Sequence, residues 1–283
     1  MQINNLNAEI KICRSNRNAS IFRVYPDFPI RVFKPGQYGS LGLFVNSKSK
    51  LVKRAYSISS SIIDIETGEL FNQKDLNYLE FYINQVPPNK KNILQITPKL
   101  FSLVDGDRIF CGEKIVGHYI LQNLQNLESI LLISTHTGES PNNAIVNQLL
   151  FDKSKVKICN INVGKSSWET LYAPEHVFLE KLYHNYKFIQ FSDNTDNYGE
   201  LSHFVNNLLH DESFAINNVG FSLNQKSNLV MLCGDPLMIG APIKKGGFNI
   251  ETPDYGLINI FAKKSYELTT RFKRGNIVYE SYW

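Results

Sequence analysis

Hydrophobic and polar residues alternate over short stretches in the first part of the chain, up to about residue 120. In residues 21–25 and 79–83, apolar side chains recur at every second position. Pairs of turn-forming residues, Pro35-Gly36 and Asp105-Gly106 among them, separate such stretches. Short alternating strands joined by turns predict an antiparallel β-barrel.

The pattern changes after residue 122. Residues 130–133 form a continuous apolar run, as expected of a parallel strand that is buried on both faces. Similar runs at 156–159 and 229–232 are separated by helical stretches. Strands alternating with helices predict a Rossmann-like parallel α/β domain. We therefore expect two domains, 1–122 and 123–283.

Composition narrows the class of protein. The 283 residues suffice for two domains, and 43% hydrophobic with 20% charged residues is typical of a soluble globular chain. No apolar run approaches the roughly 20 residues that span a bilayer, and the first residues lack a signal-peptide pattern. We therefore expect a cytoplasmic protein. A net charge of +4 gives no indication of nucleic-acid binding.

Four cysteines lie far apart in the chain: Cys13, Cys111, Cys159 and Cys233. None belongs to a Cys-x-x-Cys pair, which argues against an iron–sulfur or zinc site within this chain. We expect reduced thiols and no metal.

Residues 54–57 place an arginine, an aromatic ring and a hydroxyl close together on one expected strand. The ring of Tyr56 can stack on a flat cofactor, and the guanidinium of Arg54 can form paired hydrogen bonds with a pyrophosphate. The hydroxyl of Ser57 can lie near a reactive ring edge. This combination suits a flavin that continues into phosphates.

Further segments accompany residues 54–57 in a fixed order: Pro35-Gly36-Gln37-Tyr38, Leu79-Glu80-Phe81-Tyr82, Gly106-Asp107-Arg108, Cys233-Gly234-Asp235-Pro236 and Glu280-Ser281-Tyr282-Trp283. With them the chain resembles bacterial ferredoxin/flavodoxin–NADP reductases, within the ferredoxin-reductase-like flavoproteins. The resemblance covers nearly the whole chain. It implies a six-stranded barrel that binds FAD and an α/β domain that binds NAD(P), with an aromatic tail returning to the flavin.

The same resemblance implies roles for individual residues. The catalytic set is Ser57 at the reactive flavin edge, Glu280 for proton handling and Cys233 as a wall without a covalent role. Residues expected to hold FAD are Arg54, Tyr56, Ser57, Thr97, Tyr282 and Trp283. Thr97 is expected to cap a helix that begins at Pro98, whose amides would face the diphosphate. Residues expected to contact the pyridine nucleotide are Thr137, Gly138, Gly234 and Asp235.

Two departures from the family pattern concern the nucleotide. His136 stands where the first strand–helix turn usually has a glycine. Asp193 stands where an arginine usually binds the 2′-phosphate of NADP, and Gly164, with Lys165 next to it, occupies a second basic position. A carboxylate would repel that phosphate. We therefore expect weaker discrimination for NADPH than the family name implies, or even a preference for NADH.

The leading interpretation is an FAD-dependent enzyme that transfers electrons between NADPH or NADH and ferredoxin or flavodoxin, acting as a monomer. Three basic clusters are expected to flank the redox centre and would suit an acidic carrier: Lys48, Lys50 and Lys53; Lys244 and Lys245; Arg271, Lys273 and Arg274. One alternative is an NADH-linked flavin reductase or the reductase component of an oxygenase. Another is a flavin-binding protein with a degenerate pyridine-nucleotide site.

Overall fold

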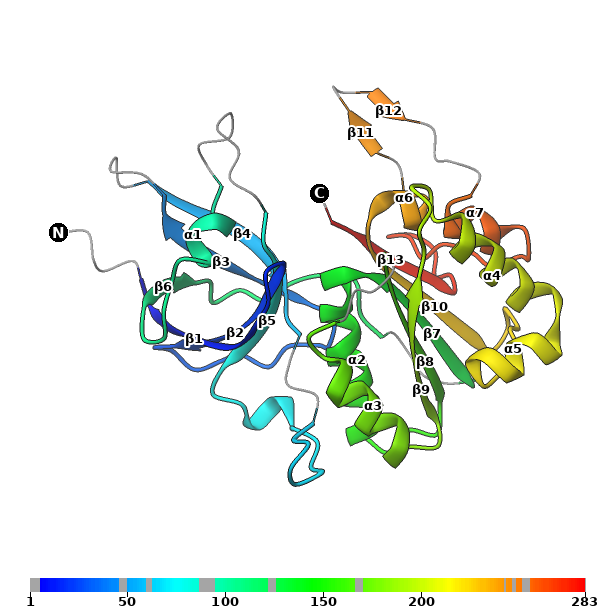
Figure 1. The fold of residues 1–283 in the computed structure, drawn as a ribbon, viewed down its shortest axis with the longest axis horizontal. Coiled ribbons are helices and arrows are strands. Elements are labelled where there is room, and N and C mark those ends of the chain that lie inside the picture. The colour runs from blue at the N-terminus through cyan, green and yellow to red at the C-terminus, as the bar shows by residue number, and fades with distance from the viewer. Residues whose placement is uncertain are drawn as a thin grey trace.

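A computed structural model describes residues 6–45, 50–59, 63–86, 95–121, 126–165, 170–241, 243–245, 248–250 and 255–282. It shows two units side by side, a curled β-sheet and an α/β layer structure (Figure 1). The predicted boundary at residue 122 falls outside the described residues. Within the described part of the chain, no helix has the length and apolar character needed to cross a membrane.

The first unit is a six-stranded antiparallel sheet in the order β4-β3-β6-β1-β2-β5. Its strands are β1 (Ala8–Ser15), β2 (Ala19–Pro26), β3 (Tyr38–Phe44), β4 (Leu51–Ser57), β5 (Leu79–Asn84) and β6 (Arg108–Cys111), with the short helices η2 (Gln73–Asp75) and α1 (Thr97–Leu100) between them. The outer strands meet where Ile58 bridges Phe81 and the Ser59 amide donates to the Glu80 carbonyl at 2.8 Å. The predicted antiparallel barrel is therefore confirmed.

The second unit is a parallel five-stranded sheet in the order β13-β10-β7-β8-β9. Its strands are β7 (Ser129–Thr135), β8 (Lys157–Gly164), β9 (Tyr186–Ser192), β10 (Asn228–Gly234) and β13 (Ile277–Ser281). All seven residues of β7 are buried, because helices cover both faces of the sheet. The predicted Rossmann-like sheet is therefore confirmed.

Helices of this unit form two layers. One face packs against α2 (Glu139–Phe151) and α3 (Ala173–Leu182), and the other against α4 (Gly199–His210), α5 (Glu212–Val219) and α7 (Leu257–Ala262). The short helices η3 (His136–Gly138) and α6 (Pro236–Ile239) follow β7 and β10, and the small strands β11 (Ile243–Lys245) and β12 (Phe248–Ile250) form a separate pair. The strand order reverses between β7 and β10, and in such sheets ligands bind beyond the carboxyl ends at that point.

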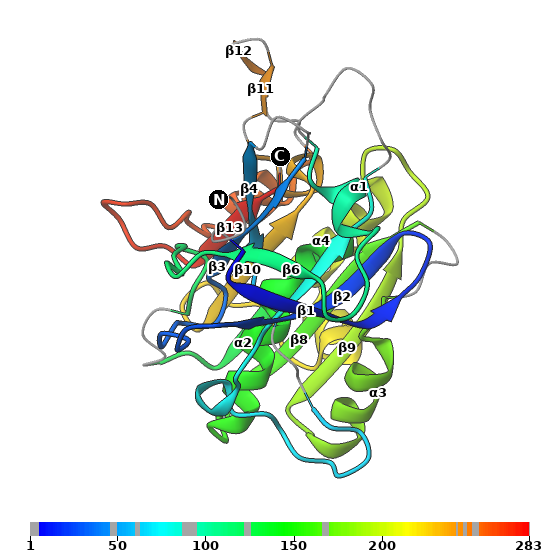
Figure 2. The same cartoon turned by 90° about the vertical axis from the view of Figure 1, so that its left-hand side faces the viewer.

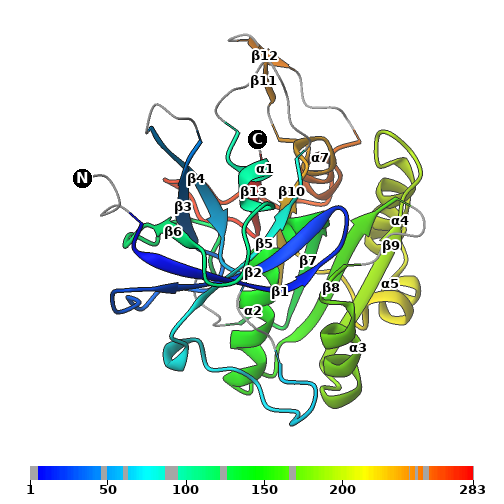
Figure 3. The same cartoon turned by 60° about the vertical axis from the view of Figure 1, so that its left-hand side comes forward.

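Helix α2 lies between the barrel and the parallel sheet (Figure 3). Its apolar residues share one cluster with barrel residues such as Ile21 and Tyr82. The Asn147 side chain donates to the Phe71 carbonyl at 2.7 Å, and Arg14 of β1 pairs with Glu175 of α3. Apolar and polar contacts together fix the two units relative to each other.

Candidate functional site

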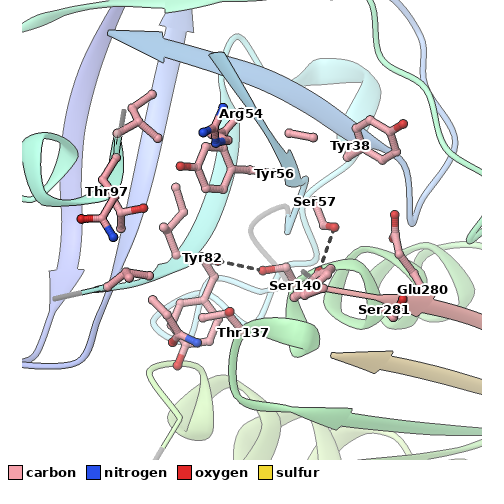
Figure 4. Close-up of a pocket in the computed structure, with 17 residues that line it drawn as sticks. Tyr38, Arg54, Tyr56, Ser57, Tyr82, Thr97, Thr137, Ser140, Glu280 and Ser281 are labelled. Atoms are coloured by element: carbon pink, nitrogen blue, oxygen red, sulfur yellow. Dashed lines mark hydrogen bonds between the residues drawn. The ribbon is translucent and has the colours of Figure 1, made fainter. Parts of the chain in front are cut away.

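A cavity of about 560 Å³ lies between the barrel, the turn after β7 and the C-terminal strand (Figure 4). Its wall is made by Tyr38, Arg54, Ala55, Tyr56, Ser57, Tyr82, Ile83, Asn84, Val86, Gln95, Ile96, Thr97, Thr137, Ser140, Glu280, Ser281 and Tyr282. The volume falls in the range of cofactor pockets. Residues expected at the flavin from three distant segments therefore meet around one cavity.

Strand β4 supplies the barrel side of this cavity. Arg54 is exposed and donates to the neighbouring Lys53 carbonyl at 3.0 Å. Tyr56 is half-buried, and burial raises its pKa to about 12, although a hydrogen bond from Thr97 and the charge of Arg54 act in the opposite direction. Tyr56 therefore stays uncharged at neutral pH and offers a neutral ring for stacking.

The C-terminal segment reaches the barrel at Ser57. The Tyr282 hydroxyl donates to the Ser57 hydroxyl at 2.8 Å, and the Tyr282 amide donates to the Gly234 carbonyl at 2.9 Å. Pairing of β13 with β10 thus delivers this ring to the cavity. Trp283, the other aromatic residue expected at the flavin, lies outside the described residues.

Glu280 precedes Tyr282 by two residues and also lines the cavity. Burial raises the pKa of its carboxyl group from 4.5 to about 7. Its Oε2 atom is buried and has no hydrogen-bond partner among the described residues. A carboxyl group that titrates near neutral pH beside a cavity is suited to proton transfer.

Cys233 lies behind this wall. It is fully buried on β10, opposite Glu280 of β13, and it does not line the cavity. Burial raises the pKa of the thiol well above its usual value. The thiol is therefore neutral and lies beside Tyr282, not in the cavity wall where it was expected.

The turns after β7 and β10 pack tightly at the point where the strand order reverses. A Cβ atom on Gly138 would lie 2.5 Å from the Cys233 carbonyl oxygen, and one on Gly234 would lie 2.2 Å from Thr135 Oγ1. Both positions therefore need glycine because of the close approach. Only Thr137 of this region reaches the cavity, whereas Gly138 and Gly234 bring the two turns together.

Asp235 and His136 belong to the same two turns, Asp235 after β10 and His136 after β7. The Asp235 carboxylate accepts hydrogen bonds from the Leu237 amide and the Tyr198 hydroxyl, both at 2.8 Å, and thereby supports α6. His136 adopts a φ of 46° and has an exposed side chain. The left-handed backbone explains why glycine suits this position.

Thr97 lines the cavity as predicted, but its expected role as a helix cap is wrong. Ile96 holds the capping position, Thr97 is the first residue of α1, and no side chain caps the helix. The helix has only four residues, so its contribution to binding an anion is small. The hydroxyl of Thr97 instead contacts Tyr56.

Asp193 does not face outward, so the expectation that its carboxylate would meet a nucleotide phosphate is wrong. Its side chain is only 3% exposed. One carboxylate oxygen accepts from the Thr195 amide at 2.8 Å, and the other accepts from the Leu201 amide at 2.9 Å. Asp193 therefore fixes the loop that leads into α4.

A buried polar cluster behind the turn was not predicted. The His176 ring forms two hydrogen bonds of 2.7 Å, between Nε2 and the Glu139 carboxylate and between Nδ1 and the Tyr186 hydroxyl. The ring also stacks on Phe188, with the ring centroids 4.2 Å apart. Glu139 also bonds to Thr170. The cluster fixes the first residue of α2, between Thr137 and Ser140 of the cavity wall. Its members come from distant segments, so no sequence spacing reveals it.

The cavity wall fits FAD. Tyr56 offers a ring, Arg54 offers a cation at the open side, and the buried Oε2 of Glu280 lacks a partner within the described residues. The described part of the chain contains no cluster of ligands that could hold a metal ion, and Cys13, Cys111, Cys159 and Cys233 are free thiols.

An antiparallel barrel joined to a Rossmann-like sheet, with the cavity at their junction, defines the ferredoxin-reductase-like fold class. The chain is 26% identical to the flavodoxin/ferredoxin–NADP reductase of Escherichia coli over 226 residues, or 79% of this chain and 83% of that protein. It is 25% identical to the protein of the same name from Buchnera aphidicola subsp. Schizaphis graminum, over 93% of each chain. The resemblance inferred from the sequence is thus confirmed. No protein-family model matches the chain.

Solved structures agree on the fold. A ferredoxin NADP⁺ reductase from Neisseria gonorrhoeae with bound FAD and NADP has a TM-score of 0.74 at 16% identity, covering 97% of each chain. The ferredoxin–NADP⁺ reductase of Plasmodium falciparum has a TM-score of 0.63 at 18% identity, covering 98% of this chain and 96% of that chain.

Proposed function

We propose that this chain is an FAD-dependent reductase that transfers electrons between a nicotinamide dinucleotide and ferredoxin or flavodoxin. The observation that carries the proposal is the convergence of Ser57, Glu280 and Tyr282 at one cavity where the barrel meets the parallel sheet. The similarity to flavodoxin/ferredoxin–NADP reductases along most of the chain supports the same activity.

In this proposal the barrel binds FAD and the α/β unit binds the pyridine nucleotide. FAD, when bound, supplies two-electron exchange with the nucleotide and single-electron exchange with the carrier. Tyr56 stacks on the flat ring, Arg54 binds the diphosphate and Ser57 donates to the ring edge. Glu280 holds or releases a proton beside the cavity, and Thr137 orients the nucleotide at the start of α2.

Anaerobic mixing tests the activity. The purified yellow protein is mixed with NADPH or NADH while the flavin absorbance is followed. Rapid bleaching is expected, and absence of bleaching with both nucleotides would indicate a flavin-binding protein with a degenerate nucleotide site. Reduced enzyme is then offered ferredoxin, flavodoxin or free flavin. Preferential reduction of free flavin would favour a flavin reductase over the proposed enzyme.

Deleting Tyr282 and Trp283 is expected to tighten binding of the oxidised nucleotide by about fivefold to tenfold. The Tyr282 hydroxyl bonds to Ser57, so a nicotinamide that approaches Ser57 must first displace this ring. Titration of the flavin spectrum with NADP⁺ and NAD⁺ measures the affinity. Tyr282→Phe, which keeps the ring but loses the hydroxyl bond to Ser57, is the comparison and should tighten binding less than the deletion does. Equal affinity in the truncated protein would show that the ring does not block the nucleotide.

Nucleotide choice is expected to depend on Lys165, because Asp193 is buried. Lys165 follows the carboxyl end of β8, and its side chain is 76% exposed. It forms an ion pair of 3.6 Å with the exposed Asp196. Lys165→Ala should lower kcat/KM for NADPH by about tenfold and leave NADH almost unchanged, since only NADPH carries the 2′-phosphate. Steady-state kinetics with both nucleotides measure this.

Lys187→Ala is the matched control for Lys165→Ala. Lys187 lies at the amino end of β9 and donates to the Asn217 carbonyl at 3.0 Å, so it is placed away from the nucleotide end of the sheet. If both variants lose NADPH selectivity equally, or neither loses it, another cation meets the phosphate.

A further inference from the structure

A basic hairpin, residues 267–277, lies between α7 and β13. Hydrogen bonds within the segment hold it, and none of its residues lines the cavity. The amides of Asn276 and Ile277 both donate to the Glu267 carbonyl at 2.9 Å, and the Thr269 amide donates to the Ile277 carbonyl at 2.8 Å. A Cβ atom on Gly275 would lie 2.0 Å from the Glu267 carbonyl oxygen, so glycine is required there. The base of the hairpin is therefore fixed before any partner binds.

The tip of this hairpin presents an aromatic ring to solvent. Phe272 is 92% exposed, and the Thr270 amide donates to the Lys273 carbonyl at 2.7 Å below it. In Figure 2 the red-orange loop that precedes β13 projects from the body of the protein. Moving such an exposed ring from water into an apolar or interfacial environment lowers the free energy.

Cations surround the ring. Arg271, Lys273 and Arg274 flank Phe272 in the chain, and all three are exposed. Lys273 pairs with Glu267 at 2.8 Å. Lys226 is exposed in the adjoining loop, which the Asn276 side chain contacts through the Gln225 carbonyl at 2.6 Å. The hairpin therefore combines one exposed ring with a local excess of positive charge.

The hairpin lies at the opposite end of β13 from the cavity. Ile277 pairs with Val230 near the start of β10, whereas Ser281 pairs with Gly234 at its end. Four residues of strand separate the two ends by about 13 Å. The cluster at 271–274 thus does not flank the cavity as the sequence analysis expected, and a partner seated on the hairpin leaves the cavity open.

We propose that the basic hairpin docks the protein on the surface of an anionic lipid bilayer. A protein partner would offer a pocket to an aromatic anchor, but Phe272 stands on a convex tip with cations on both sides. That arrangement matches an interfacial surface, where the ring enters the headgroup region and Lys or Arg side chains meet acidic headgroups. The inference does not depend on the proposed enzymatic function.

Vesicle sedimentation tests the proposal. The purified full chain is mixed with vesicles of 30% phosphatidylglycerol and 70% phosphatidylcholine, or of phosphatidylcholine alone, at about 100 mM and 500 mM salt, which differ in charge screening. We expect sedimentation with the anionic vesicles only, and loss of binding at high salt. Phe272→Ala should weaken binding by about fivefold or more, and Arg271→Glu should weaken it by at least fivefold, since one cation near such a surface contributes about that factor.

Matched controls separate docking from general effects. Val32→Ala shortens an apolar side chain that is 83% exposed on the barrel unit, and Lys181→Glu reverses an exposed charge on α3. Both should sediment as wild type does, and flavin content should be unchanged in every variant. No sedimentation of the wild type with anionic vesicles, or undiminished sedimentation of Phe272→Ala, would overturn the proposal. Binding to soluble polyglutamate as strong as to vesicles, and insensitive to Phe272→Ala, would also overturn it in favour of an acidic protein.

Discussion

Replacing Glu280 with glutamine is expected to slow turnover with the nicotinamide nucleotide at pH 7 by about 100-fold or more. Burial raises the pKa of the Glu280 carboxyl group to about 7, so both of its protonation states are populated at neutral pH. Glutamine keeps the shape and the hydrogen-bonding capacity but cannot exchange a proton. Stopped-flow flavin reduction and steady-state turnover, measured from pH 5.5 to 9, report the loss.

The pH profile gives the sharper test of Glu280. The wild type should show a change in rate near pH 7 that is absent in Glu280→Gln. Glu9→Gln, which neutralises an exposed carboxylate on the barrel, is the matched control and should keep the wild-type profile. If the variant retains both the rate and the profile, Glu280 is a bystander of the reaction.

The same raised pKa predicts a dependence of stability on pH. Between pH 4.5 and about 7 the folded protein holds a proton that the unfolded chain releases, so the free energy of unfolding falls as the pH rises through this range. The stability lost from this group is at most about 3.4 kcal/mol, and the loss is complete above its folded pKa. Urea denaturation measures the free energy of unfolding of both proteins. The value for Glu280→Gln minus that for wild type should be larger at pH 8 than at pH 5.

Much of the fold could be predicted because it depends on local patterns. Alternation of apolar residues in 79–83 identified β5, and the apolar run 130–133 identified β7. Burial on both faces was predicted for β7 only, whereas residues 79–83 are also all buried although their sequence alternates. The segment 54–57 could be identified as one side of the cavity because all its groups belong to one strand.

Other features could not be predicted because they depend on contacts between distant segments. The direction of the Asp193 side chain is set by the Leu201 amide in the next helix. The pairing of Glu139 with His176 joins α2 to α3, and neither residue shows a recognisable spacing. The helix that begins at Thr97 was expected one residue later because Pro98 suits the first helical position, whereas the structure has Pro98 at the second.

Arg54→Ala is expected to weaken FAD binding by about tenfold to 100-fold, which corresponds to the loss of a charge-assisted contact of about 1.5–3 kcal/mol. Arg54 lines the cavity from β4, beside Tyr56, and its exposed guanidinium can form paired hydrogen bonds with a diphosphate. Equilibrium titration of the flavin-free protein with FAD, followed by flavin fluorescence, measures the affinity.

Two further substitutions separate the geometry of Arg54 from its charge. Arg54→Lys keeps the cation but not the planar fork, so its affinity for FAD should fall between those of wild type and Arg54→Ala. Lys53→Ala removes the neighbouring cation, which lies over the Phe110 ring at 3.7 Å and does not line the cavity, so flavin binding should be unchanged. FMN lacks the pyrophosphate, so its affinity should fall less than that of FAD in Arg54→Ala. Equal losses for FMN and FAD would place the guanidinium away from the diphosphate and assign the effect to packing against Tyr56.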